Sequence, residues 1–288
     1  MEKILILIIL FIMIRLIPCN YLKTSSIKNV PYDPINPANL LYSENPIEGF
    51  EITNKEKNQI YYLLKTITDI LDSKKIIYWI DGGTILGAIR HGCLIPWDDD
   101  VDICMLESDY DKLEEITEYV KPLGFEIIKY WDLYKFRFIG KEYPFVDIFL
   151  NIKKDNKYTL NSSHMLEYWP NEYFEHDELF PLKKYKFGDH YYSGPNYPLD
   201  YLDRMYSLWE FIGIQSYDHK AKKKIKTTVI LDPLNNDMIL KPYYLIKPND
   251  NIHQIFNEKF NKYNIVNVNE EKLLKLKKKL LELELELE

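Results

Sequence analysis

Apolar residues recur along the first half of the chain with two different periods, and these periods predict its secondary structure. After Thr53, apolar side chains return every three or four residues as far as residue 71, which is the spacing of one helix face. Thr53-Asn54-Lys55-Glu56 matches a capping box and predicts where this helix begins. Further helices are predicted over 84–90 and 110–120, and strands over 76–80, 101–105, 125–130, 133–139 and 145–152. This alternation predicts an α/β (α+β) domain with a mixed β-sheet core flanked by helices.

The two ends of the chain follow other patterns. Residues 4–14 are an unbroken apolar run, shorter than the roughly twenty residues that span a bilayer, so residues 1–19 are predicted to be a signal peptide or a signal anchor. Residues 20–50 are polar and proline-containing, as in a stem or linker. We expect residues 51–215 to form the main domain. Beyond residue 156 the sequence predicts an aromatic-rich, irregular chain with helical patches near 198–208. Residues 216–288 are expected to be an irregular, aromatic-rich C-terminal extension with a low-complexity tail.

This organisation predicts a location. Either interpretation of residues 1–19 directs the rest of the chain into the secretory pathway. The protein is then expected in the Golgi or endoplasmic-reticulum lumen as a single-pass membrane protein, or to be secreted. The N-terminal segment would be its contact with a membrane.

Composition excludes several classes of protein. With 10 glycines and 15 prolines among 288 residues, the chain is neither collagen-like nor a Pro/Gly-rich disordered segment. Three cysteines cannot build a disulfide scaffold, although one bond between Cys93 and Cys104 stays open. A net charge of −7 disfavours general nucleic-acid binding, so no nucleic-acid partner is expected. The 24 tyrosines suit a sugar-stacking surface and an aromatic core equally well.

The candidate chemistry gathers between residues 80 and 150. Asp98, Asp99, Asp100 and Asp102 fall within five residues at the start of a predicted strand. Because side chains alternate across a strand, Asp100 and Asp102 share one face, where two carboxylates repel unless a cation lies between them. This pattern indicates an oxygen-ligated Mg²⁺ or Mn²⁺ site, whereas most acidic runs are solvated turns. Asp147 lies in an apolar strand, where a lone carboxylate is costly to bury, so it is expected to line a site or to cap a strand end.

Other polar residues near the acids have two interpretations each. Gly82-Gly83-Thr84 follows a strand and opens a helix, so it makes either a phosphate cradle or a plain turn. Arg90, at the end of that helix, either contacts phosphate or offsets the negative C-terminus of the helix. Lys135 and Arg137 share a strand face, where they bind a diphosphate or simply face solvent.

In combination these segments resemble the LicD/fukutin-like family of the nucleotidyltransferase-fold superfamily. The resemblance is carried by Gly82-Gly83-Thr84, LGAIRHG (86–92), IPWDDDVDI (95–103), FVDIF (145–149), ELFPLKKYKFG (178–188) and PNYPLDYLDRMY (195–206). It covers roughly residues 55–210. Ser207 departs from the family, which often has glycine there; the departure is expected to affect a turn and not the chemistry.

The resemblance implies a nucleotidyltransferase-like fold and a metal-dependent phosphotransferase. Such an enzyme moves a phosphorylated small alcohol, for example phosphocholine or ribitol phosphate, from a CDP-activated donor to a glycan acceptor. By similarity, Asp100, Asp102 and Asp147 are the catalytic metal ligands, and the cofactor is Mg²⁺ or Mn²⁺. Asp147 is also the expected base, and Gly82, Gly83, Thr84, Arg90 and Arg137 are the expected substrate-binding residues.

Two other functions fit parts of the pattern. An Asp-x-Asp metal motif also occurs in glycosyltransferases that use a sugar nucleotide, but the upstream glycine pair and the third acid favour the phosphotransferase. A non-catalytic glycan-binding relative would be expected to lose one of the three acids, and all three are present. Transfer of the nucleotide itself is a variant of the first function that side-chain types do not decide.

Overall fold

The structure is a computed structural model that describes residue 50 and residues 52–206, 208–210 and 212–231. The predicted signal segment over 1–19, the stem up to residue 49, Ser207 and the low-complexity tail all lie outside the described residues. Within the described ranges, no helix combines the length and the hydropathy needed to cross a bilayer. The predictions of a membrane segment and of a secretory location therefore stay predictions.

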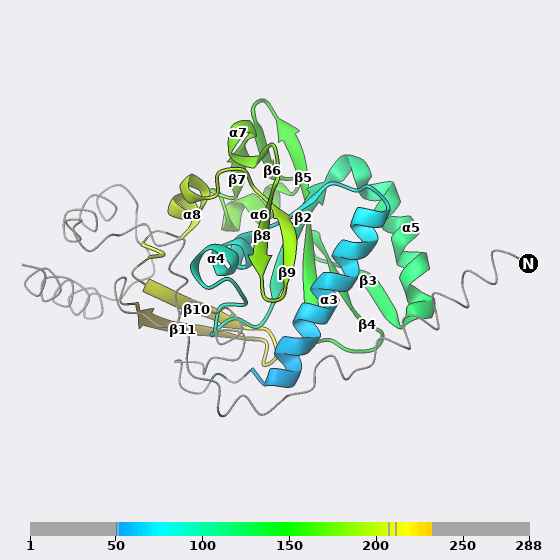
Figure 1. Ribbon diagram of the computed structural model, residues 1–288, viewed down its shortest axis with the longest axis horizontal. Coiled ribbons are helices and arrows are strands. Elements are labelled where there is room, and N and C mark those ends of the chain that lie inside the picture. Colours follow the sequence, from blue (N-terminus) through cyan, green and yellow to red (C-terminus); the bar gives the residue numbers. More distant parts are fainter. Residues whose placement is uncertain (1–49, 51, 207, 211, 232–288) are drawn as a thin grey trace, which may run out of the picture. The chain divides into compact units, whose positions relative to one another are not determined.

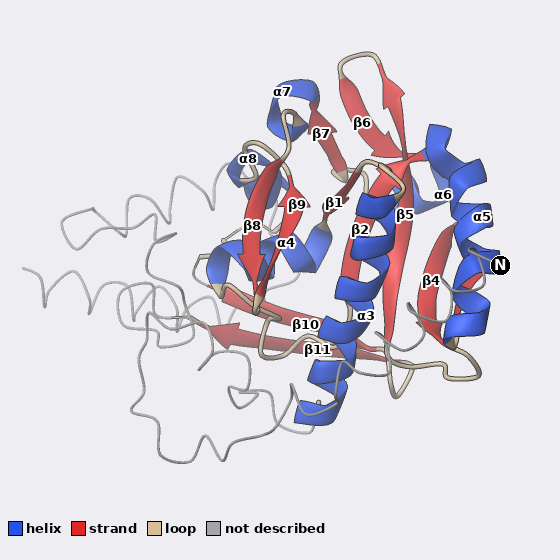
Figure 2. Cartoon of the chain, turned by 45° about the vertical axis from the view of Figure 1, so that its right-hand side comes forward, coloured by secondary structure: helices blue, strands red, loops and turns tan. Residues whose placement is uncertain are grey.

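The first described helix, α3 (Asn54–Ser73), begins where the capping box predicted it. Thr53 Oγ1 accepts a hydrogen bond from the backbone N–H of Glu56 at 3.2 Å, and Glu56 Oε2 accepts one from the Thr53 N–H at 2.8 Å. These two bonds satisfy backbone donors that a helix leaves unpaired at its start. The apolar face of α3 packs against β4 and β5, and Figure 2 shows the helix crossing in front of the sheet.

The central sheet is mixed, as predicted, and its strand order is β1-β2-β5-β4-β3. Figure 1 labels β2, β5, β4 and β3 of this sheet. Its strands are β1 (Tyr78–Ile80), β2 (Val101–Leu106), β3 (Phe125–Tyr130), β4 (Leu133–Phe138) and β5 (Phe145–Lys154). Strands β2 and β5 run parallel, whereas β1–β2, β3–β4 and β4–β5 are antiparallel. β6 (Lys157–Leu160) pairs with β5 and β7 (Tyr173–Glu175) pairs with β6, both antiparallel.

Side-chain alternation gives this sheet one apolar face and a second face that carries the candidate polar residues, here called the polar face. Ile103, Phe136 and Ile148 lie on the first face and are fully buried in one core with residues of α3 and α5 (Tyr110–Val120). Asp102 and Lys135 both lie beside Asp147 in the strand register, so these three side chains share the opposite face. The candidate chemistry is therefore confined to one side of the sheet.

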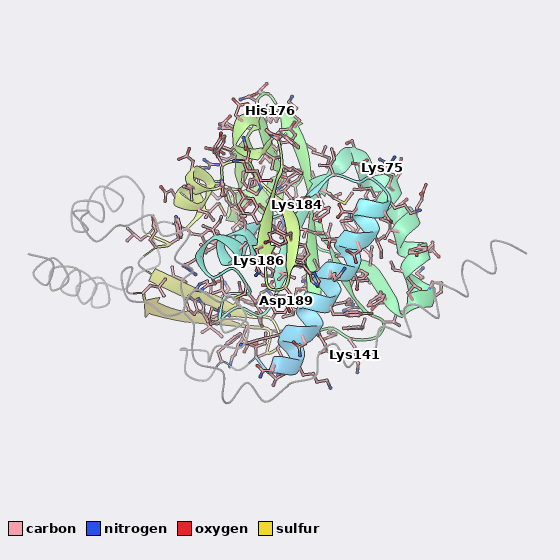
Figure 3. The ribbon with its side chains drawn as sticks, in the orientation of Figure 1. Lys75, Lys141, His176, Lys184, Lys186 and Asp189 are labelled. Atoms are coloured by element: carbon pink, nitrogen blue, oxygen red, sulfur yellow. The ribbon has the colours of Figure 1, made fainter. Side chains whose placement is uncertain are left out.

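The chain beyond residue 156 is more regular than the sequence indicated. It forms α6 (Ser163–Tyr168), α7 (His176–Leu179), α8 (Leu199–Met205) and two hairpins, β8 (Lys183–Phe187) with β9 (His190–Gly194) and β10 (Ile212–Asp218) with β11 (Lys223–Ile230). In β8, Tyr185 and Phe187 are buried while Lys184 and Lys186 alternate with them on the outer side (Figure 3). The strand period was thus present, but lysines between aromatic residues made it hard to separate from an irregular segment. Strand β10 crosses the predicted domain boundary after residue 215, and that boundary stays a prediction.

Candidate active site

A glycine turn between β1 and α4 (Gly82–Arg90) lets the backbone approach the acidic segment. The helix begins at Gly82, two residues earlier than predicted. A Cβ on Gly82 would lie 2.9 Å from Asp102 Oδ2, and a Cβ on Gly83 would lie 2.8 Å from Asp98 Oδ2. Gly82 also has a φ of +52°, in the left-handed region that glycine adopts without strain. A side chain at either glycine would therefore displace the neighbouring carboxylate.

The three predicted metal ligands come together on the polar face of the sheet. Asp102 on β2 and Asp147 on β5 are direct neighbours in the parallel register, and Asp100 immediately precedes β2. One carboxylate oxygen of each residue lies within 4.8 Å of the other two. Three oxygen ligands held this close are the donor set that Mg²⁺ and Mn²⁺ prefer.

The electrostatics of this cluster also fit a cation. Burial and the neighbouring Asp100 carboxylate raise the pKa of Asp102 well above its usual value. Burial also raises the pKa of Asp147, which settles at about 6 although the Lys135 ammonium lowers it. Carboxylates whose pKa is raised in this way would be ionised more easily with a divalent cation between them. The residues present therefore fit the predicted metal.

A histidine that the sequence analysis did not select completes a second group of ligand atoms. His219 follows β10, and its Nδ1 lies 2.8 Å from Asp99 Oδ1 while its Nε2 lies 3.2 Å from Asp100 Oδ2. The His219 backbone N–H donates to Asp99 Oδ2 at 2.9 Å. Burial lowers the pKa of His219, but Asp100 and Asp99 outweigh that effect and raise it to about 9. A lone histidine 120 residues from its partner carries no sequence signal of this pairing.

Of the two basic residues predicted on one strand face, Lys135 is the one that contacts the acids. Its Nζ donates to Asp147 Oδ1 at 2.7 Å and lies 3.3 Å from the centroid of the Phe145 ring. Arg137 instead donates from Nε to Glu126 Oε1 on β3 at 2.9 Å. Lys135 therefore lies beside the acids, and the predicted contact of Arg137 with substrate stays a prediction.

Thr84 and Arg90, both predicted to contact substrate, are buried in packing contacts. The Thr84 Oγ1 accepts the backbone N–H of Asp102 at 2.7 Å, so this hydroxyl positions the strand that carries the acid. The guanidinium of Arg90 donates from Nη1 to the Trp209 carbonyl at 2.7 Å and from Nε to His91 Nε2 at 2.8 Å. The predicted contacts of Thr84 and Arg90 with substrate stay predictions.

A layer of buried polar groups supports the glycine turn from behind. Asp81, the residue before α4, accepts a hydrogen bond from the thiol of Cys104 at 3.0 Å. Cys104 and Cys93 are both free, so they do not form the disulfide that the sequence left open. Tyr201, in the segment 195–206, donates to Glu172 at 2.8 Å and also receives the first N–H of α4. Burial raises the pKa of Asp81 and of Glu172.

Comparison with known proteins places these residues in a known family region. A family model described as LicD/FKTN/FKRP, nucleotidyltransferase domain, matches residues 75–197. An uncharacterised protein of Rickettsia prowazekii is 33% identical over 225 residues, which are 76% of this chain and 81% of that protein.

Shorter matches join the chain to two named proteins. The human ribitol 5-phosphate transferase FKRP is 40% identical over 50 residues, 17% of this chain and 10% of that protein. The lipopolysaccharide cholinephosphotransferase LicD of Haemophilus influenzae is 48% identical over 42 residues, 15% of this chain and 16% of that protein. Among solved structures, the lincomycin-bound lincosamide adenylyltransferase LnuA matches with a TM-score of 0.33 and 20% identity over 50% of this chain and 81% of that one.

Proposed function

This chain belongs to the LicD/FKTN/FKRP nucleotidyltransferase family, whose named members transfer phosphorus-containing groups, and from that premise we propose that it moves a phosphorylated small alcohol from a CDP-activated donor to a glycan. The observation that carries the proposal is the cluster of Asp100, Asp102 and Asp147. The names of FKRP and LicD suggest ribitol phosphate and phosphocholine as the transferred group. The matches span only 10% of FKRP and 16% of LicD. The identity of the donor and of the acceptor is therefore proposed here and is not taken from these matches.

Asp100, Asp102 and Asp147 would hold the Mg²⁺ or Mn²⁺ ion. Their oxygens lie within 4.8 Å of one another, and the raised pKa values of Asp102 and Asp147 reflect burial and mutual repulsion that a cation offsets. When bound, the ion supplies positive charge that stabilises the diphosphate and the leaving nucleotide.

The residues of the chain itself orient the donor and accept the proton. The acceptor hydroxyl attacks the phosphorus that carries the alcohol, the bond from this phosphorus to the bridging oxygen breaks, and cytidine monophosphate leaves. Asp147 accepts the proton of the hydroxyl, because a carboxylate held beside the ion lies next to the attacking oxygen. The Lys135 ammonium beside Asp147 and the N-terminus of α4 at Gly82 both favour phosphate oxygens.

Release of cytidine monophosphate by the full chain tests this proposal. We expect release from CDP-choline, CDP-ribitol or CDP-glycerol when Mg²⁺ or Mn²⁺ and a glycan acceptor are present. Asp102→Asn should lower the rate by more than about 100-fold, because it removes a ligand charge from the cluster. The matched control is Asp155→Asn, which removes an exposed carboxylate from the turn between β5 and β6 and should leave the rate unchanged.

Two results would contradict the proposal. Metal-dependent consumption of a UDP-sugar or of GDP-mannose, with no use of CDP-alcohols, would identify the Asp-x-Asp glycosyltransferase instead. Full activity of Asp102→Asn would exclude the metal assignment.

The proposed location needs a separate test. We propose that residues 1–19 direct the chain to the secretory pathway, on the evidence of the apolar run over 4–14 alone. Cell fractionation of the full chain and of the chain lacking residues 1–19 should place only the full chain in the membrane or lumenal fraction. Identical fractionation of the two would contradict this proposal.

A further inference from the structure

A row of exposed aromatic side chains lies beside the polar face of the sheet. Tyr130 is 49% exposed, Trp131 64%, Tyr168 61% and Trp169 42%. The rings of Tyr130 and Trp131 are parallel within 1°, with centroids 6.1 Å apart, and His164 lies 6.0 Å from Trp131 and 5.3 Å from Tyr168. Tyr168 and Trp169 are 6.3 Å apart. These five residues form a continuous surface that we call the aromatic strip.

Lys135 joins the aromatic strip to the candidate active site. Its Nζ lies 4.9 Å from the centroid of the Tyr130 ring and 2.7 Å from Asp147 Oδ1. Tyr130 pairs with Leu133 in the β3–β4 register, two residues from Lys135, so Tyr130 and Lys135 lie on the same face of the sheet. A molecule that rests on Tyr130 is therefore separated from the proposed base by one ammonium group.

The strip is held in place from below. Met165 of α6 is buried with Leu133 and Leu160, in a small apolar cluster separate from the main core. Ser162 Oγ accepts the N–H of Met165 at 3.1 Å and donates to Asp132 Oδ2 at 2.7 Å, which joins α6 to the β3–β4 turn. Both halves of the strip therefore sit on anchored backbone.

Trp131 combines an exposed indole with a backbone conformation that bulky residues seldom adopt. Its φ is +54°, in the left-handed region that glycine and asparagine occupy readily and that a bulky residue rarely adopts. Glycine would make this turn with less backbone strain, and an indole that is 64% exposed contributes little to the core. An exposed tryptophan at a turn, next to the rings of Tyr130 and His164, is the pattern of a binding surface.

We propose that the aromatic strip binds the acceptor glycan, which rests on the proposed function, and that sugar rings lie along the strip with the attacking hydroxyl near Asp147. One face of a pyranose ring carries C–H groups that pack on an aromatic ring, while its hydroxyls need polar partners at the rim. Asp132 and His164 supply such polar groups, 3.5 Å apart, at the edge of Trp131.

Charge disfavours a lipid surface as the occupant. Asp132 is partly exposed beside Trp131, and Glu167 of α6 is exposed next to Tyr168. Anionic headgroups would repel these carboxylates, whereas the hydroxyls of a neutral sugar can donate hydrogen bonds to them. The contact with Lys135 and Asp147 also gives an acceptor, and not a bilayer, a reason to lie here.

Binding measured without donor separates this proposal from the phosphotransfer itself. The full chain is applied to a broad glycan array, and the best oligosaccharide is titrated by intrinsic tryptophan fluorescence. We expect Trp131→Ala and Tyr168→Ala each to weaken its binding by about tenfold, the cost of one lost stacking contact. Tyr191→Ala, which removes an equally exposed tyrosine from β9, is the control and should bind as the parent does.

Turnover with a CDP-alcohol supplies the second readout. Trp131→Ala should raise KM for the glycan by about tenfold and leave KM for the donor unchanged, because the strip holds only the acceptor. Asp102→Asn should lose transfer and keep glycan binding. Glycan binding that depends on Trp131 in a chain that uses no CDP-alcohol would keep the strip and reject the proposed function.

The proposal for the strip fails on any of three results. These are no glycan bound on the array, equal binding by the parent and Trp131→Ala, or Trp131-dependent binding only to vesicles of phosphatidylcholine and phosphatidylglycerol. Because Trp131 and Tyr168 are exposed, replacing them should leave the fold intact, and equal thermal unfolding of the variants checks this directly.

Discussion

At the scale of single residues, His219 acts through the carboxylates that it touches. Its two ring nitrogens contact Asp99 at 2.8 Å and Asp100 at 3.2 Å, and Asp100 is a proposed metal ligand. A hydrogen bond to a ligating carboxylate fixes its orientation, and loss of such a partner commonly costs 10- to 100-fold in metal affinity. His219 is therefore a positioning residue for Asp100.

We predict that His219→Gln weakens Mn²⁺ binding by about 10- to 100-fold and lowers kcat/KM to a similar degree. Isothermal titration with Mn²⁺ measures the affinity. The control, His190→Gln, changes an exposed histidine of β9 and should bind Mn²⁺ normally. Unchanged affinity in His219→Gln would remove this residue from the site.

At the scale of elements, the glycine turn and β2 form one unit. The turn places the first residues of α4 against Asp98 and Asp102, and Thr84 accepts the N–H of Asp102. The contacts between α4 and β2 therefore fix the positions of the Asp98 and Asp102 carboxylates. A side chain on either glycine would push the acids out of place.

We predict that Gly82→Ala lowers the free energy of unfolding by at least about 1 kcal/mol, since alanine is strained at positive φ, and that it also abolishes activity. Gly140→Ala separates the two effects. Gly140 has a φ of +70° but nothing within 4 Å of its Cβ position, so this variant should share the strain and keep the activity. Chemical denaturation measures the stability of both. An active Gly82→Ala would show that the close approach to Asp102 is dispensable.

At the scale of the whole molecule, folding brings together carboxylates that repel one another. Asp98 and Asp102 both have pKa values raised well above the usual range, first by burial and then by neighbouring acids. Holding these carboxylates together therefore lowers the stability of the folded protein, and a bound cation would offset this cost. This cost makes stability depend on pH and on metal.

The sign of the pH dependence follows from Asp147, whose pKa rises from 3.8 to about 6 on folding. Between these two values the native state holds more protons than the unfolded state, so the stability of the metal-free protein falls as pH rises through that window. Asp147→Asn should flatten this decline, and Asp155→Asn should not. Denaturant unfolding in EDTA at a series of pH values measures it.

Metal should stabilise the protein most where the acids are ionised. Because ligands bind metal only when deprotonated, Mn²⁺ should raise Tm more at about pH 8 than at about pH 5. Thermal unfolding with and without Mn²⁺ measures the two shifts. Equal shifts at both pH values would argue against carboxylate ligation.

The local elements of the first half were predictable because their signals are local. The capping box placed the start of α3, and Tyr110–Val120 and Phe125–Tyr130 agree with the predicted ranges. The acids Asp100, Asp102 and Asp147 were selected because a lone carboxylate in an apolar strand and a close acidic pair are unusual in themselves. Beyond residue 156, alternating lysines and aromatic residues obscured strand β8.

The sequence by itself determined the helices and strands around the acids, the family and the three candidate ligands, since hydrophobic period and residue type act over a few positions. Only the tertiary structure decided which distant groups meet. It brought His219 onto Asp99 and Asp100, put Lys135 and not Arg137 on Asp147, and buried Arg90. These contacts depend on strand register and on a hairpin formed more than a hundred residues later, which no local pattern encodes.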